Sequence, residues 1–242
     1  EDLLYKLFGV NAELLIDHAW GWEPVTMDMI KAYRPETSSI SSGQVLQSPY
    51  TSAKARNVVL EMADSLSLDL VDKKLVTDQL VLTVGYDTES LTDKDIREKY
   101  QGKVSTDRYG RQVPAHAHGT VNMERPTSSG KILTEKVGGL FDRIVNRDLL
   151  VRRITLSANH LVYETNIQPN NKAVQLDLFT DYEKLGKERK AEEEVLARER
   201  RRQEAVLQIK KKFGKNAILK GLNYADGATQ KERNQQIGGH HE

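Results

Sequence analysis

Apolar residues follow a helical spacing in two stretches of this chain and alternate with polar residues in others. One series recurs every four positions and consists of Val58, Met62, Leu66 and Leu70. It predicts an amphipathic helix that is capped by Thr51 or Ser52. A second such helix is predicted by the series Ile132 or Leu133, Val137, Leu140, Phe141 and Ile144. Each helix has one apolar face that needs a sheet or another helix to cover it.

Strict alternation predicts a strand at residues 78–86, because Leu80, Leu82 and Val84 would share one face. Further strands are predicted within residues 35–50, at 118–124 and at 149–164. The order of elements is then β-α-β-β-α-β. Chains of this order commonly form a four-stranded sheet with both helices on one face, an α+β fold. The opposite face of the sheet would stay free for a partner.

The remaining segments are expected to be helical or irregular. Residues 1–34 read as short helices that stop at Gly9 and Gly21, with Asn11 as a cap. Trp20 and Trp22 are expected to pack against these helices rather than to offer a stacking platform.

Beyond the predicted sheet order lie a polar insertion and a long C-terminal region. The insertion spans residues 87–117 and is expected to contain a short helix near 94–100. Residues 166–180 read as a linker, and the spacing of Thr180 and Glu183 predicts a capping box. A long charged helix is expected over 181–214, followed by a largely loop-like tail at 215–242.

Composition excludes several classes of protein. The chain has 242 residues, a formal net charge of +1 and no cysteine, so disulfides and thiolate metal sites are excluded. It has no apolar run long enough to span a membrane and no signal-peptide pattern, which favours a cytoplasmic protein without a membrane partner. His116 and His118 would share a strand face, but the sequence offers no clear third ligand, and no metal site is expected.

The segment "NKAVQLDLFTDYEK" places three large apolar residues in polar surroundings next to the linker. One interpretation is a short edge strand or helix start that packs on the preceding domain. The other is a docking peptide whose spacing resembles the Gln-Leu-x-Leu-Phe motif by which bacterial replication proteins bind the β sliding clamp. In that reading Gln175 would contact a polar rim, while Leu176, Leu178 and Phe179 would fill an apolar pocket. We favour the docking peptide, because the linker before it and the helix cap after it both expose the motif.

Several longer stretches resemble the C-terminal half of Y-family translesion DNA polymerases, most closely the UmuC-like ImpB/MucB/SamB branch of Gram-positive bacteria. The stretches that carry the resemblance are "LYKLFGVNAELLIDHAWGWEPV", "SSISSGQVL", "LLVRRITLSANHL" and "IKKKFGKNAILKG…ERNQQIGGH". The resemblance implies the end of a helical thumb at residues 1–34. It implies a DNA-binding little-finger domain at 35–165, with two helices on one face of its sheet.

In this family the little finger lies along the DNA major groove and touches phosphates with its last strand. The resemblance therefore implies primer-template DNA as partner and phosphate contacts from Arg152 and Arg153; ordinary surface salt bridges are the alternative. Ser39, Ser41 and Ser42 are further candidates, with a plain loop as the alternative. Neighbouring residues on a strand point to opposite faces, so only one of the two arginines is expected on the open face.

The resemblance also implies what the chain lacks. The family's catalytic carboxylates and Mg²⁺ ions belong to a palm that precedes the thumb, and no Asp-Glu dipeptide of that kind occurs here. We therefore expect a fragment without catalytic residues or cofactor of its own, which binds DNA and the clamp for an error-prone lesion-bypass polymerase in DNA repair. The alternative is a structural or adaptor protein that associates through its charged helix.

Overall fold

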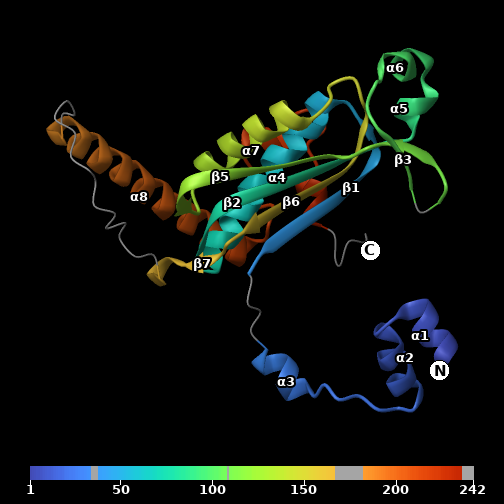
Figure 1. The fold of residues 1–242 in the computed structure, drawn as a ribbon. Helices are drawn as coiled ribbons and strands as arrows, with labels where there is room; N and C mark the ends of the chain where they lie inside the picture. The colour runs from blue at the N-terminus through green and yellow to red at the C-terminus, as the bar shows by residue number, and fades with distance from the viewer. Residues whose placement is uncertain (34–37, 108, 167–181, 236–242) are drawn as a thin grey trace. The chain divides into compact units, whose positions relative to one another are not determined.

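The computed structural model describes residues 1–33, 38–107, 109–166 and 182–235 (Figure 1). It divides the chain into two compact units, Glu1–Thr37 and Ser38–Glu242. The first contains helices α1 (Asp2–Phe8), α2 (Asn11–Ala19) and α3 (Met27–Ala32). Helix α1 ends at Gly9, which has a φ of +57°, as the sequence predicted. Asn11 is the first residue of α2 and not its cap, because the N-cap is Val10.

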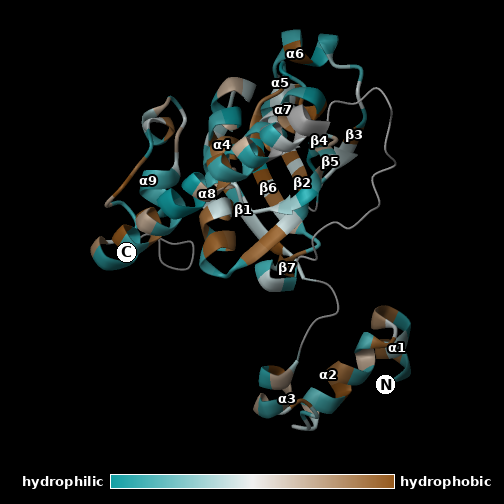
Figure 2. Cartoon of the chain, turned by 90° about the vertical axis from the view of Figure 1, so that its left-hand side faces the viewer, coloured by the Kyte–Doolittle hydropathy of each residue, from teal (hydrophilic) through white to brown (hydrophobic). Residues whose placement is uncertain are grey.

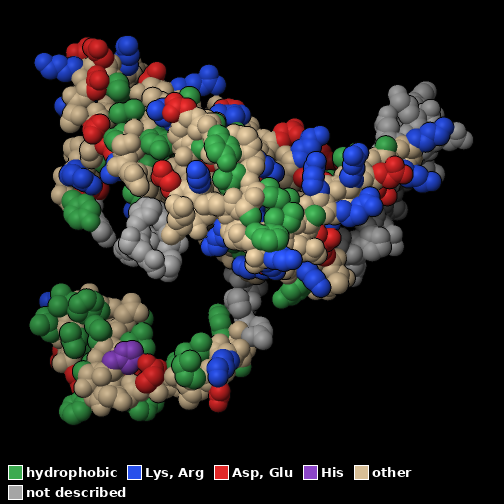
Figure 3. Space-filling model, turned by 180° about the vertical axis from the view of Figure 1, so that it is seen from behind, with side chains coloured by type: hydrophobic (Ala, Val, Ile, Leu, Met, Phe, Trp, Pro, Cys, Tyr) green, Lys and Arg blue, Asp and Glu red, His purple; other side chains and the backbone are tan. Residues whose placement is uncertain are grey.

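The two tryptophans of the first unit correct a prediction. Trp20 is 83% exposed and Trp22 is 58% exposed, so neither packs into a core. Among residues 1–33, Ala12 is the one buried side chain, because three helices of at most nine residues enclose almost no volume. Hydrophobic side chains consequently gather on the surface of this unit (Figure 3).

The second unit is built on an antiparallel sheet with two helices on one face (Figure 1). Its strands are β1 (Ile40–Tyr50), β2 (Leu75–Tyr86), β5 (Ala117–Thr127) and β6 (Val151–Asn159), in the spatial order β1-β6-β2-β5. Helices α4 (Ser52–Asp72) and α7 (Gly130–Ile144) contact each other and pack against the sheet. The predicted α+β fold and its β-α-β-β-α-β order are confirmed.

The core lies between the sheet and these two helices. Leu80, Leu82 and Val84 of β2 are fully buried, as their alternation predicted. Figure 2 shows the hydrophobic residues along β2 and β6 in the middle of the sheet. Gly119 of β5 lies where a Cβ atom would come within 2.9 Å of Ile144 and Leu140 of α7. A larger residue at position 119 would therefore force the side chains of Leu140 and Ile144 to shift within a closely packed core.

The last strand is shorter than predicted. Strand β6 ends at Asn159, and His160 turns the chain with a φ of +51°. Its imidazole Nδ1 lies 2.9 Å from a carboxylate oxygen of Asp78. The segment β7 (Val162–Tyr163) then pairs with the start of β2, and a short 3₁₀ turn, η1 (Glu164–Asn166), follows. Alternation alone did not reveal this turn, because non-glycine residues rarely adopt positive φ.

The polar insertion forms helices and a separate two-stranded hairpin at one end of the sheet. It contains α5 (Glu89–Thr92), α6 (Lys94–Lys99) and a hairpin of β3 (Val104–Thr106) and β4 (Gln112–Pro114). The short helix predicted near 94–100 is confirmed, whereas the hairpin was not predicted. Ile96 and Tyr100 pack against the hydrophobic core, and Leu150 donates its backbone N–H to the Ser90 hydroxyl at 2.9 Å. These contacts fix the insertion to the end of the sheet.

The long charged helix, α8 (Tyr182–Phe213), ends before Gly214, which has a φ of +97°. Its middle is anchored to the turn between β5 and α7. Glu199 accepts hydrogen bonds from the Ser129 hydroxyl at 2.6 Å and from the backbone N–H of Lys131 at 3.0 Å. Gln203 donates to the carbonyl oxygen of Ser128 at 3.1 Å. Part of one face of α8 is therefore occupied within the same chain.

Residues 215–235 contain more regular structure than the loop that the sequence predicted for the tail. It forms a 3₁₀ turn, η2 (Gly221–Tyr224), and the short helix α9 (Gln230–Arg233). Both are held by Glu61 of α4, which is 1% exposed. Its carboxylate accepts hydrogen bonds from the Asn223 side chain at 2.7 Å and from the backbone N–H of Thr229 at 2.7 Å. In the described part of the chain, no helix is long and apolar enough to cross a membrane.

Candidate nucleic-acid interface

The sheet face opposite the helices, here called the free face, carries mainly polar side chains. Strand register places them in rows across the four strands, since paired residues of antiparallel strands share a face. The rows comprise Gly43, Thr155, Thr83 and His118; Ser41, Ser157, Val81 and Thr120; Asn159, Gln79 and Asn122; and Val45, Arg153 and Gly85. This set contains no Asp or Glu, although the whole chain has 35 of them.

Hydrogen bonds join the polar residues of the free face across neighbouring strands. Asn159 donates to Gln79 at 3.1 Å, and Gln79 in turn donates to Asn122 at 3.0 Å. The Ser157 hydroxyl donates to Ser41 at 2.8 Å. Each of these side chains keeps further donor or acceptor capacity beyond these bonds. The free face is therefore pre-arranged to offer hydroxyl and amide groups to a ligand.

Arg153 lies on the free face, where it pairs with Val45 of β1 and Gly85 of β2. It is exposed and forms no ion pair or hydrogen bond with any residue that the structure describes. Gly85 leaves room beside it, since a Cβ there would meet the Arg153 side chain at 3.4 Å. Its guanidinium is the one unpaired full positive charge among the residues of the rows described above.

Arg152 is engaged within the protein. Its guanidinium donates to the carbonyl oxygen of Gln47 at 3.0 Å and lies 3.6 Å from the carboxylate of Asp87. The side chain is 39% exposed. The expectation that the two arginines differ in orientation is therefore met, with Arg153 on the free face and Arg152 at the irregular end of the strand pair.

The three candidate serines are separated by the same alternation. Ser39 is exposed and directly precedes β1. Ser41 lies on the free face, two rows from Arg153. Ser42 pairs with the buried Leu156, so its hydroxyl belongs to the face that the helices cover.

The two histidines do not form a metal site with other residues that the structure describes. His118 Nδ1 lies 2.9 Å from the Thr83 hydroxyl, within the free face. Among the described residues, no group of three or more His, Asp or Glu side chains is arranged to hold a metal ion.

The candidate clamp motif precedes α8 in the sequence. Gln175, Leu176, Leu178 and Phe179 lie outside the described residues, as does the capping residue Thr180. The described chain resumes at Tyr182, the first residue of α8.

Sequence reasoning missed the amide and hydroxyl rows of the free face. Gln79, Thr83, Ser157 and Asn159 occupy alternate positions of the two central strands, so the signal was present in the alternation. That signal was used for the apolar side chains only. The polar residues between them form rows because the strand order places β2 next to β6.

Comparison with known proteins places part of the chain in a family. A family model described as the impB/mucB/samB family C-terminal domain matches residues 37–178. The chain is 13% identical to the solved structure "Y-family DNA polymerase chimera Dbh-Dpo4(243-245)-Dbh", with a TM-score of 0.33. It is also 13% identical to "Post-insertion binary complex of Dbh DNA polymerase", with a TM-score of 0.32. Each match covers 66% of this chain and 38% of the other. No curated protein matches the chain.

Proposed function

Because this chain belongs to the impB/mucB/samB family, whose C-terminal domain it contains at residues 37–178, we propose that it binds DNA through the free face of its sheet. The observation that carries this proposal is the absence of carboxylates from the rows of the free face, combined with the unpaired guanidinium of Arg153. A phosphate backbone would repel carboxylates and attract that charge. Surrounding hydroxyl and amide groups can donate to phosphate oxygens.

The chemistry of this face favours binding with little sequence preference. One free guanidinium and a set of short polar side chains suit phosphate oxygens, and phosphate contacts carry no base information. Few cations take part, so the affinity of this chain alone should be modest and should fall as salt rises. In the proposed parent, a Y-family polymerase for lesion bypass, a Mg²⁺-binding palm would supply catalysis, and this chain would hold primer-template DNA in place.

We further propose that Gln175–Phe179 docks on a bacterial β sliding clamp. The order of elements supports this role. The motif lies between η1, which ends at Asn166, and α8, which is anchored to the domain at Glu199. A docking peptide in this position would connect the clamp to the DNA-binding domain through a short length of chain.

The DNA proposal is tested by fluorescence anisotropy with a duplex of about 20 base pairs at two salt concentrations. Arg153→Ala should weaken binding and reduce the slope of log affinity against log salt by about 0.9, the value for one lost phosphate contact. Lys136→Ala is the matched control, because it removes an exposed cation from α7 on the opposite side of the sheet. If the two variants bind alike, the free face is not the DNA site.

A further inference from the structure

The insertion lines a hollow of about 550 Å³ that is open to solvent, at the end of the sheet. Its polar lining comes from α5, α6 and the β3–β4 hairpin, and includes Thr88, Thr92, Arg97, Tyr100, Arg111 and Gln112. Two guanidinium groups and several hydroxyl and amide groups thus face one space. None of the described residues that line it is acidic.

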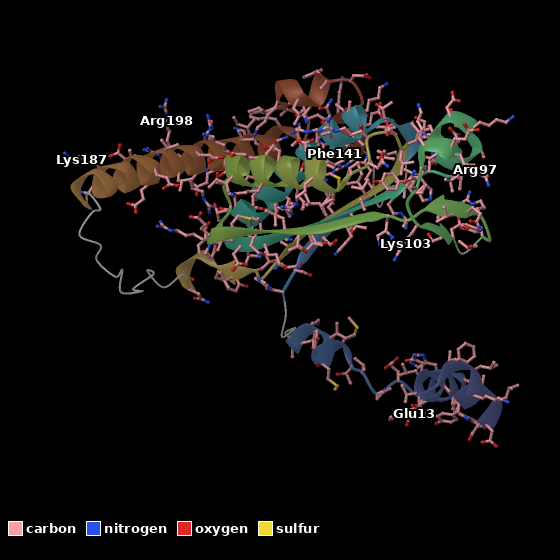
Figure 4. The ribbon with its side chains drawn as sticks, turned by 45° about the horizontal axis from the view of Figure 1, so that its top comes forward. Glu13, Arg97, Lys103, Phe141, Lys187 and Arg198 are labelled. Carbon is pink, nitrogen blue, oxygen red and sulfur yellow. The ribbon has the colours of Figure 1, made fainter. Side chains whose placement is uncertain are left out.

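The two arginines of the hollow play different parts. Arg97 is exposed on α6 (Figure 4). It has no ion-pair or hydrogen-bond partner among the described residues. Arg111 is held in place by Asp107, whose carboxylate lies 2.7 Å and 2.8 Å from two guanidinium nitrogens. The backbone N–H of Arg111 holds the pKa of the Asp107 carboxyl below its ordinary value, since this hydrogen bond stabilises the charged carboxylate. The Arg111 guanidinium is therefore fixed, and the Arg97 charge is free for a ligand.

The hollow is fixed relative to the proposed DNA-binding face. Tyr100 packs on the core and donates its hydroxyl hydrogen bond to the carbonyl oxygen of Lys103 at 2.9 Å. Asp87, between β2 and α5, donates its backbone N–H to Leu150 at 2.8 Å and lies beside Arg152. The insertion therefore continues from the sheet end at which β6 begins, and Arg152 and Arg153 lie in the first residues of that strand. A ligand that extends past Arg153 in that direction would meet the insertion.

We propose that the hollow lined by Arg97 and Arg111 binds a phosphate group of the same DNA backbone, beyond the reach of the sheet. This inference rests on the proposed DNA-binding function and extends it to the insertion. The unpaired Arg97 would supply the charge, and the fixed Arg111 with the nearby hydroxyl groups would orient the phosphate oxygens. The insertion would thereby lengthen the DNA footprint of the domain by at least one phosphate.

The test compares single variants of the full 242-residue chain, again by anisotropy with the duplex at two salt concentrations. Arg97→Ala should lower affinity about two- to fivefold at the lower salt, because exposed ion pairs contribute little each. It should also reduce the salt slope by about 0.9. Lys99→Ala is the matched control: it removes an equal charge from the same helix, but Lys99 does not line the hollow. Its affinity and slope should equal those of the unchanged chain.

The outcomes separate this inference from the function on which it rests. If Arg153→Ala weakens binding but Arg97→Ala behaves like Lys99→Ala, the inference fails and the proposed function stands. If the unchanged chain does not bind the duplex, the proposed function itself fails. A free nucleotide offers the same phosphate chemistry, so a second arm titrates the chain with dATP by calorimetry. Binding of dATP that Arg97→Ala abolishes, with DNA affinity unaltered, would overturn the assignment to the DNA backbone.

Discussion

The carboxylate of Glu199, in the middle of α8, lies at the first turn of α7 and accepts a 2.6 Å hydrogen bond from the Ser129 hydroxyl. The backbone N–H of Lys131, which has no partner within the helix, donates to the same carboxylate at 3.0 Å. A residue 70 positions away in sequence thus completes the N-terminus of a helix of the core. The negative charge at that position also interacts favourably with the helix dipole.

Glu199→Ala should lower the free energy of unfolding by about 1–3 kcal/mol, because it leaves one buried donor, the Ser129 hydroxyl, and one partly buried donor, the Lys131 N–H, without an acceptor. Urea denaturation followed by circular dichroism measures the change. Glu204→Ala, on the same helix, is the control. It removes an exposed i,i+4 pair with Arg200 and should cost about 0.5 kcal/mol or less. Equal losses in both variants would argue against the capping role of Glu199.

Glu61→Ala should release the C-terminal tail from α4. The substitution removes the acceptor for the side chain of Asn223 and for the backbone N–H groups of Thr229 and Gln230. Limited proteolysis should then cut residues 215–235 faster, while the sheet stays protected. Glu135→Ala, at an exposed position of α7, should leave the cleavage pattern unchanged. A tail that stays protected in Glu61→Ala would show that its other contacts, such as that of Gln44 with Thr229, hold it without Glu61.

Asp142→Asn should lower stability in a pH-dependent way. Arg56 of α4 bonds both oxygens of Asp142 on α7 at 2.9 Å and holds the pKa of that carboxyl below its ordinary value. Stability from such a pair is present above the ordinary pKa of 3.8 and is lost as the pH falls through the lower folded-state pKa. Both side chains are partly exposed, so the loss at pH 7 should be at most about 1 kcal/mol.

Denaturation at pH 7 and near pH 2.5 checks this prediction. The difference between Asp142→Asn and the unchanged chain should shrink at the lower pH. Asp148→Asn serves as the control, because no ion pair of the Asp148 side chain occurs with the described residues. A difference that persists undiminished in acid would mean that Asp142 acts through packing or neutral hydrogen bonds.

Replacing both Leu178 and Phe179 by Ala should abolish a micromolar interaction with the β sliding clamp. By the usual scale of interface hot spots, each loss could cost about 2 kcal/mol or more. Surface plasmon resonance with immobilised clamp measures the affinity. Asp177→Ala is the control within the motif, because that side chain is expected to stay in solvent. DNA binding by the double variant should be unaltered, and undiminished clamp affinity would refute the docking role.

The periodicity of the sequence determined the main elements of the fold. Leu80, Leu82 and Val84 alternate because one face of β2 is buried, and the four-residue spacing of Val58, Met62 and Leu66 follows the pitch of α4. When one face of a strand or helix is buried, apolar residues recur along the sequence with the period of that element. The sequence likewise predicted the charged helix and its end at Gly214, since helix propensity and the preference of glycine for positive φ are local properties.

The tertiary structure alone decided how distant polar residues combine. Three sets of hydrogen bonds join residues that are 37 or more positions apart in the sequence. They are Glu61 with Thr229, Glu199 with Ser129, and the row of Asn159, Gln79 and Asn122. Nothing in the local pattern separates Arg152, which is paired with Asp87, from Arg153, which has no partner among the described residues. The physical reason is that the role of a polar side chain depends on the group with which it forms a hydrogen bond or ion pair. That partner is set by strand order and helix packing rather than by its neighbours in the chain.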